Sequence, residues 1–292
     1  MKIGVAGTGR MDAAMAQRLM SVGHGVTVWN RSPEKTQPLA EAGAKVAVTP
    51  RELAAACELV ITILTDASAI EATYGGESGL LAGDVKGKLF VEMSTVRPET
   101  EEKLAAKVKA KGAALVDCPV GGSTVPARDG KLFGFAGGDD ADVERAKPVL
   151  DQLCRRVEHV GPTGAGARMK LAINLPLLVY WQSLGEALYI IKPLNLDPAR
   201  VIDILADTSG GPNVLKSRGP ALAAALQGKE ITPVTFDVDS IRKDLRTMIE
   251  EGHALGSDMP ITERALACFD DASEGGLGPK DASTLPASFA RK

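Results

Sequence analysis

The sequence predicts an α/β fold: a doubly wound, mostly parallel sheet followed by an all-α domain, with a long helix between them. Short runs rich in Val, Ile and Leu alternate with helical patterns through the first half of the chain, and no strand pattern remains after about residue 162. Regular alternation implies βαβ crossovers, and continuous apolar runs fit strands that are buried on both faces. We therefore expect a nucleotide-binding α/β domain over residues 1–162 and an all-α domain over 163–292.

The individual elements follow from the hydrophobic pattern. Apolar residues at positions 11, 15, 19 and 22 recur at helical spacing, which predicts a helix behind the first strand. We expect the closing segment LPASFARK (285–292) to be loosely packed. The expected strands are 2–6, 25–30, 44–48, 59–64, 89–93, 114–118, 132–137 and 157–161. The expected helices of the second domain are 167–192, 198–207, 213–226, 237–255 and 260–274.

Composition excludes several classes of protein. The 292 residues are 45% hydrophobic and 24% charged, with a net charge of −3 and mixed charges, so no nucleic-acid partner is predicted. The longest apolar stretch, around LPLLVYW, is too short to span a bilayer, so no membrane partner is predicted. The first strand starts at once, without a signal-peptide pattern, and the expected location is cytoplasmic. Four widely spaced cysteines favour reduced thiols over a disulfide framework, and no metal site is predicted.

A glycine-rich turn joins the first strand to the first helix. In a Rossmann unit, Gly7 would make the tight turn, and Gly9 would let the backbone approach a pyrophosphate at the helix N-terminus. The alternative is a Rossmann-like domain without nucleotide binding. The predicted cofactor-contacting residues of this turn are Gly7, Thr8, Gly9, Arg10 and Met11.

Asp12 stands where a third glycine or an alanine would allow close packing of helix on strand. Its carboxylate adds bulk and a negative charge near an anionic ligand. It could instead accept hydrogen bonds from the free N–H groups of the first helical turn.

The second strand ends in residues that favour NADP(H) over NAD(H). An NAD site would have Asp or Glu here to bind the ribose 2′-hydroxyl, whereas Asn30 is neutral and Arg31 can pair with a 2′-phosphate, with Ser32 as a further donor. Further residues just past strand ends are candidates for contact with cofactor or substrate, although a hydroxyl in such a place can equally cap a helix. They are Leu64, Thr65, Ser94 and Thr95.

The long helix carries the candidate acid/base. Lys170 and Asn174 are four residues apart and share a helix face in apolar surroundings. A partly desolvated lysine would have a lowered pKa and could exchange a proton near neutrality. From the spacing alone, a catalytic Lys170 and a lysine that only extends from a packed helix to solvent are equally good interpretations.

A second loop offers an anion site. The segment DCPVGGSTVP leaves a strand at residue 117, and backbone N–H groups at Gly121 and Gly122, with the Ser123 hydroxyl, could hold a substrate carboxylate. Read alone, it can also be a simple Gly/Pro turn. Lys243 could reach a cofactor, but by itself a surface ion pair is the better interpretation.

Taken in order, these motifs resemble the β-hydroxyacid dehydrogenase family, which includes 3-hydroxyisobutyrate dehydrogenases. The resemblance covers nearly the whole chain, and WNRS looks like the corresponding segment of the NADPH-using glyoxylate/succinic semialdehyde reductases of that family. Its motifs are GxGxM, Ser94-Thr95, DCPVGG, GxGxxxKxxxN, KDL (243–245) and GPKDAS (278–283).

The resemblance implies hydride transfer between NADP(H) and a small β-hydroxyacid or semialdehyde, such as glyoxylate, succinic semialdehyde or a 3-hydroxyisobutyrate-like acid. It assigns the acid/base role to Lys170 and substrate contact to Asn174, places the substrate carboxylate at the 121–123 loop, and matches Thr95 and Lys243 to cofactor contacts. It also implies a homodimer or homotetramer.

The chain departs from the family pattern at three places: Asp12, Gly121 in place of the usual serine, and Val125-Pro126 in the loop. Two alternatives stay open. Imine or ketone reductases share the architecture but usually replace the catalytic lysine, which Lys170 retains. A non-catalytic dinucleotide-binding dimeric scaffold is the other alternative.

Overall fold

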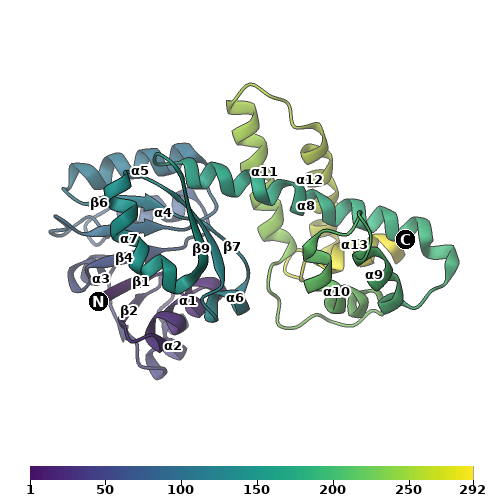
Figure 1. The fold of residues 1–292 in the computed structure, drawn as a ribbon, viewed down its shortest axis with the longest axis horizontal. Helices are drawn as coiled ribbons and strands as arrows, with labels where there is room; N and C mark the ends of the chain where they lie inside the picture. The colour runs from purple at the N-terminus through teal and green to yellow at the C-terminus, as the bar shows by residue number, and fades with distance from the viewer. Residues whose placement is uncertain (292) are drawn as a thin grey trace. The chain divides into compact units, whose positions relative to one another are not determined.

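The computed structural model describes residues 1–291, and the chain divides into two compact units, Met1–Leu171 and a second that begins at Ala172. The first unit contains the sheet and the second is helical (Figure 1). The predicted fold class is confirmed. The predicted domain boundary after residue 162 stays a prediction, since helix α8 (Ala165–Ile191) runs through the point where the two units divide.

The sheet of the first unit has nine strands in the order β3-β2-β1-β4-β5-β6-β8-β7, with β9 paired to β8. Its first six strands are all parallel, and the β6–β8 and β7–β8 pairs are antiparallel. The order 3-2-1-4-5-6 is that of the doubly wound dinucleotide-binding fold. The strands are β1 (Lys2–Ala6), β2 (Gly25–Trp29), β3 (Lys45–Val46), β4 (Leu59–Thr62), β5 (Leu89–Glu92), β6 (Ala114–Asp117), β7 (Val120–Gly121), β8 (Leu132–Gly137) and β9 (Cys154–Gly161).

Helices cover both faces of this sheet. Ile3, Val5 and Ile61 point to a core shared with α1 and α7, whereas Val60 and Phe90 point to a second core under α3, α4 and α5. Such strands are apolar on both sides, which explains their continuous hydrophobic runs. The helical elements of this unit are α1 (Arg10–Ser21), the 3₁₀ turn Pro33–Thr36, α2 (Gln37–Glu41), α3 (Pro50–Ala56), α4 (Ala67–Tyr74), α5 (Pro98–Ala110), α6 (Thr124–Arg128) and α7 (Asp140–Leu153).

The second unit is formed by helices with clear start signals. Asp197 and Asp237 each accept a hydrogen bond from the backbone N–H three residues on, Arg200 at 3.0 Å and Ser240 at 2.8 Å. This satisfies an N–H group that the helix itself leaves without an acceptor. The elements after α8 are the 3₁₀ turn Lys192–Leu194, α9 (Pro198–Ala206), α10 (Asn213–Leu226), α11 (Val238–Ala254), α12 (Pro260–Ala272), the π-helical turn Ser273–Leu277 and α13 (Thr284–Arg291).

The prediction of a loose C-terminal segment is wrong for the residues that the structure describes. Thr284–Arg291 form helix α13, in which Leu285 and Ala287 are buried. Gly185 of α8 lets this helix approach closely, since a Cβ there would lie 3.1 Å from Pro286 Cα and from Phe289 Cβ. Lys292 lies outside the described residues.

Two further features of the chain bear on its class. The four cysteines are free thiols. None of the helices within residues 1–291 is both long enough and apolar enough to cross a bilayer.

Candidate functional site

The glycine turn lies at the carboxyl end of β1, beside the end of β4. Gly7 has a φ of +111°, and a Cβ there would lie 2.7 Å from the carbonyl oxygen of Ile63. Its N–H donates to the Trp29 carbonyl at 2.9 Å, which joins the turn to the end of β2. Only glycine fits both the backbone conformation and the space. This is the switch point of the sheet, where ligands bind outside the strand ends in this class of fold.

The Asp12 side chain hydrogen-bonds to the backbone of the glycine turn. Its Oδ2 accepts the Gly9 N–H at 2.9 Å, and a Cβ on Gly7 would lie 2.5 Å from the same oxygen. Burial raises the pKa of Asp12 to about 7, against the lowering effect of the Gly9 hydrogen bond. Of the two readings of Asp12, the structure shows the one in which the carboxyl group serves the first helical turn.

Thr8 and Asn30 connect the turn to the end of β2. The Thr8 N–H donates to Asn30 Oδ1 at 3.2 Å, and Asn30 Nδ2 donates to the Ser32 carbonyl at 3.0 Å. The Thr8 hydroxyl oxygen is buried and has no hydrogen-bond partner. Arg31 is exposed next to them and forms no ion pair within the described part of the chain.

These features fit a dinucleotide. An unpartnered buried hydroxyl, a glycine turn at the switch point and the N-terminus of α1 together offer donors to a pyrophosphate. Arg10 and Met11 open that helix, and Thr65 is exposed just beyond β4. All of these residues are among those that the sequence predicts at the cofactor.

Ser94 forms hydrogen bonds within the protein at the ends of two strands. It is 2% exposed, accepts the Leu64 N–H at 2.7 Å and donates its hydroxyl hydrogen to Glu92. These bonds join the ends of β4 and β5 and leave the hydroxyl no hydrogen to donate to a ligand. The predicted contact of Ser94 with the substrate stays a prediction. Thr95, the next residue, is half-buried.

Lys170 lies against the loop that was predicted to hold the substrate carboxylate. Its Nζ donates to the Val120 carbonyl at 2.7 Å, and the side chain is half-buried. Gly122 has a φ of +130°, and a Cβ there would lie 2.7 Å from Leu132 Cδ2, so this position requires glycine. Gly121 is less crowded, because its nearest neighbours would be 3.8 Å away. Ser123 is exposed at the start of α6.

Sequence reasoning gave no role to Asp117, at the start of this loop. It is fully buried, and its oxygens accept the N–H groups of Gly164 at 2.8 Å and Ala167 at 2.9 Å. Burial raises the pKa of Asp117 to about 7. Local sequence pattern could not predict these contacts, because Gly164 and Ala167 are 47 and 50 residues from Asp117 along the chain.

Two candidates lie in the second unit. Asn174 is 9% exposed on α8, one helical turn beyond Lys170 and on the same face. Lys243 on α11 pairs with the buried Asp244, Nζ to Oδ1 2.6 Å, and keeps about a third of its side chain exposed. The ion pair expected from the sequence is therefore present, and it leaves part of the lysine accessible.

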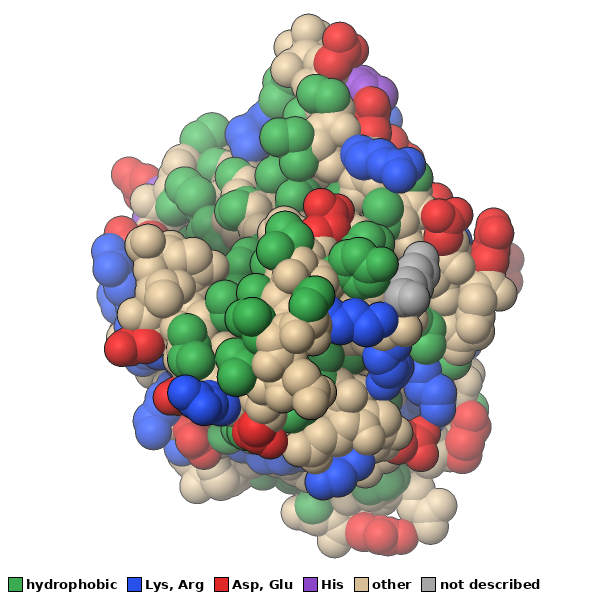
Figure 2. All heavy atoms as spheres, turned by 90° about the vertical axis from the view of Figure 1, so that its right-hand side faces the viewer, with side chains coloured by type: hydrophobic (Ala, Val, Ile, Leu, Met, Phe, Trp, Pro, Cys, Tyr) green, Lys and Arg blue, Asp and Glu red, His purple; other side chains and the backbone are tan. Residues whose placement is uncertain are grey.

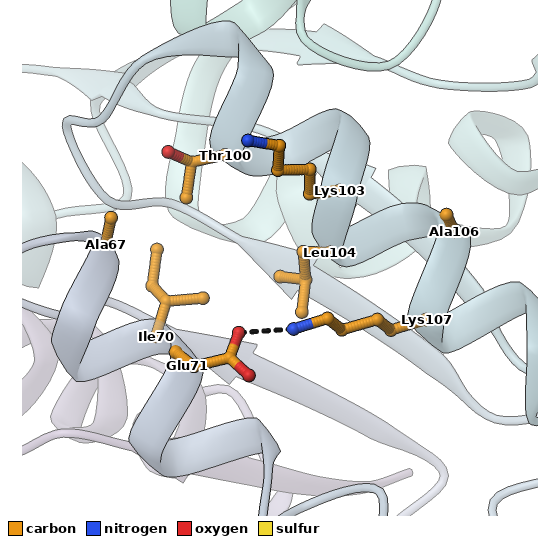
Figure 3. A pocket seen from close by; sticks show the side chains of 8 residues that line it. All are labelled: Ala67, Ile70, Glu71, Thr100, Lys103, Leu104, Ala106 and Lys107. Atoms are coloured by element: carbon orange, nitrogen blue, oxygen red, sulfur yellow. Dashed lines mark hydrogen bonds and ion pairs between the residues drawn. The ribbon is translucent and has the colours of Figure 1, made fainter.

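A separate pocket of about 400 Å³ lies between α4 and α5 (Figure 3). Ile70 and Leu104 line it together with the ion pair between Glu71 and Lys107. None of the predicted site residues lines this pocket. It is a surface feature of the first unit and not the site described above.

Fold and site together define a dinucleotide-binding protein of the doubly wound class with a helical second unit. Residues 2–161 match the family model described as the NAD binding domain of 6-phosphogluconate dehydrogenase. Residues 164–287 match the model described as NAD-binding of NADP-dependent 3-hydroxyisobutyrate dehydrogenase. The chain belongs to the β-hydroxyacid dehydrogenase family.

Two individual relatives match nearly the whole chain. Glyoxylate/succinic semialdehyde reductase 1 of Arabidopsis thaliana is 33% identical over 98% of this chain and 97% of its own. The 3-hydroxyisobutyrate dehydrogenase of Pseudomonas aeruginosa is 32% identical over 94% and 95%. The chain is thus an NAD(P)-dependent oxidoreductase of the kind that acts on the CH–OH group of hydroxyacids.

Solved structures give the same result. Psf3 in complex with NADP+ and 2-OPP superposes with a TM-score of 0.86 at 26% identity, covering 98% of this chain and 99% of that one. This supports the predicted binding of NADP(H). A reductive aminase from Aspergillus terreus, with a TM-score of 0.64 at 23% identity and 99% of both chains covered, shares the fold alone.

Proposed function

We propose that the protein reduces a small carbonyl acid with NADPH, or oxidises the corresponding hydroxyacid, and that Lys170 is the acid/base. Glyoxylate, succinic semialdehyde and a 3-hydroxyisobutyrate-like acid are the candidate substrates. The observation that carries this proposal is the contact of Lys170 Nζ with the Val120 carbonyl, 2.7 Å away, at the start of the Gly121-Gly122 loop. It brings the candidate proton donor and the candidate carboxylate loop together.

Each group has a distinct chemical task. NADPH, when bound, supplies the hydride. As the carbonyl carbon of the substrate is reduced, Lys170 as an ammonium donates a proton to its oxygen; in oxidation, the neutral amine accepts that proton. Gly121, Gly122 and Ser123 offer N–H and hydroxyl donors to the substrate carboxylate. Asn174, one turn along α8, can hold the reacting oxygen in place.

Replacement of Lys170 tests the catalytic role. We expect Lys170→Ala to lower kcat/KM for glyoxylate or succinic semialdehyde by about 10²–10⁴-fold, because it removes a general acid. NADPH affinity, measured by fluorescence titration, should stay within about twofold. Lys109→Ala, at an exposed position on α5, is the matched control and should behave like the native protein. Native turnover in Lys170→Ala would rule out the assigned role.

Preference for NADPH is proposed to depend on Arg31. Its guanidinium is exposed and forms no ion pair within residues 1–291, so it is available to a 2′-phosphate. We expect Arg31→Ala to raise the Kd of NADPH about tenfold, the loss of one charge-assisted hydrogen bond, and to leave that of NADH unchanged. Titration of both coenzymes against both proteins measures this. An equal loss for both coenzymes would contradict the proposal.

We also propose that the helical unit mediates self-association. Several large apolar side chains of this unit are exposed, among them Ile190 at 77% and Leu194 at 62%. Figure 2 shows hydrophobic side chains gathered on the face of the helical unit that it presents. Exposed apolar patches of this kind mark interaction surfaces.

A further inference from the structure

We infer that Asp117 is a positioning residue that fixes the first turn of α8 and thereby keeps the Lys170 ammonium at the substrate loop. This inference rests on the proposed function, in which Lys170 is the acid/base. It concerns a residue that touches neither substrate nor cofactor in that mechanism.

The carboxyl group of Asp117 caps the helix from another part of the chain. A helix leaves its first N–H groups without intrahelical acceptors, and here Asp117 Oδ1 accepts from Gly164 at 2.8 Å while Oδ2 accepts from Ala167 at 2.9 Å. Gly164 is the residue before the helix and Ala167 is the third residue of the helix, so each oxygen binds a different point of the first turn. This fixes both the position and the rotation of the first turn.

Close packing leaves the carboxyl group little freedom. A Cβ on Gly137 would lie 2.5 Å from Asp117 Oδ1, and a Cβ on Gly166 would lie 2.8 Å from Asp117 Oδ2. Asp117 itself has no exposed surface. The absence of side chains at these two glycines is what allows the strand end and the helix end to meet at this distance.

The same short segment holds Lys170 at its other end. Ala167 and Lys170 are three residues apart, less than one helical turn, so a shift of the first turn moves Lys170 with it. Val120, whose carbonyl accepts from Lys170 Nζ, is three residues from Asp117. One segment therefore fixes the helix backbone through Asp117 and receives the ammonium through Val120.

Asp117→Asn is the informative substitution. The amide keeps the shape and one acceptor oxygen, but its NH₂ group cannot accept the second N–H. We expect kcat with succinic semialdehyde or glyoxylate to fall about 10–100-fold, since a displacement of about 1 Å in a catalytic group costs this much. The Kd of NADPH should stay within about twofold. Amide exchange at Gly164 or Ala167, measured without cofactor, should become faster.

A double-mutant cycle separates positioning from general damage. If Asp117 acts through Lys170, adding Asp117→Asn to Lys170→Ala should lower the residual rate less than about twofold. Asp197→Asn, which removes the acid that caps α9, is the control and should leave kcat unchanged. If the asparagine variant does not fold, Asp117→Glu takes its place in the cycle.

The outcomes are distinguishable. An equal loss in both backgrounds, or native kcat in Asp117→Asn, would overturn the inference while the strong effect of Lys170→Ala kept the proposed function. Native kcat in Lys170→Ala would overturn both, because Asp117 would have no catalytic lysine to position.

Discussion

A carboxyl group occupies the place of a small residue at Asp12, and its environment explains how the loop accepts it. The side chain is 4% exposed and turns under Gly7 to accept the Gly9 N–H. Burial disfavours the ionised form, so the pKa of Asp12 rises from 3.8 to about 7. Near neutral pH the group is close to half neutral, which reduces its repulsion of an anionic ligand.

This pKa predicts a pH-dependent stability. The folded protein holds a proton on Asp12 between pH 3.8 and about 7 that the unfolded chain has lost, so the stabilisation is full below pH 3.8 and disappears as the pH rises through 7. Between pH 5 and 8 the loss is at most about 3 kcal/mol. In Asp12→Asn, which cannot ionise, the free energy of unfolding should fall less over this range.

Urea unfolding at pH 5, 6, 7 and 8 measures the difference. The slope contributed by Asp117, whose pKa is also raised to about 7, is present in both proteins and cancels. Asp197→Asn, at an exposed helix cap, should follow the native protein. Parallel curves for native protein and Asp12→Asn would show that Asp12 is ionised in the folded state well below pH 7.

Residue identities could be predicted more readily than residue partners. The motifs marked Lys170 and Gly122, because a lysine among apolar residues and paired glycines are visible along the chain. They did not reveal that Ser94 joins two strand ends, nor that Asp117 binds a helix 47 residues away. A buried polar side chain is explained by what it bonds in three dimensions, which local pattern does not contain.

At the scale of elements, the predicted order of strands and helices agrees with the structure, but the short pieces do not. The predicted strand 44–48 is reduced to Lys45–Val46, and the two-residue strand β7 was not predicted. β9 begins at Cys154, earlier than the predicted 157. Two-residue strands carry too few positions to show a period of two, and they depend on hydrogen bonds to neighbouring strands.

Helix α13 is another short element that the sequence pattern does not predict. Its eight residues include Pro286 in the first turn, which is compatible with a helix, and its apolar positions pack onto other helices of the second unit. A helix this short is not stable alone, so tertiary contact decides whether it forms. The pattern of a chain end therefore could not predict it.

The GPKDAS segment acts as an anchor within the helical unit. Asp281 is 1% exposed and pairs with Arg218 of α10, and it accepts the Ser283 N–H at 3.0 Å. Burial alone would raise the pKa of Asp281, but the Arg218 guanidinium and the backbone N–H groups of Ser283 and Thr235 together outweigh it and hold the pKa below the ordinary value. In this chain the motif thus has a structural role, because it attaches the segment before α13 to α10.

At the scale of the whole molecule, a group of large apolar side chains is exposed on the helical unit. Tyr189, Ile190 and Leu194 lie at the end of α8 and in the turn that follows, and Ile204 lies on α9. Between 47% and 77% of each of these residues is exposed. Scattered apolar residues are normal on a surface, but a group within one stretch of chain is typical of an interface.

The self-association proposed above predicts that a carboxylate placed in this group weakens the oligomer. The chain has a mass of 30.5 kDa, so the native protein should sediment at twice that mass or more. Ile190→Glu should raise the dissociation constant at least about tenfold, because an unpaired carboxylate buried in an apolar interface costs more than the 1.4 kcal/mol that this factor represents. Leu255→Glu, 65% exposed at the end of α11, is the control and should leave the mass unchanged. Sedimentation equilibrium over a range of concentrations measures all three proteins, and a native protein of 30.5 kDa throughout would contradict self-association.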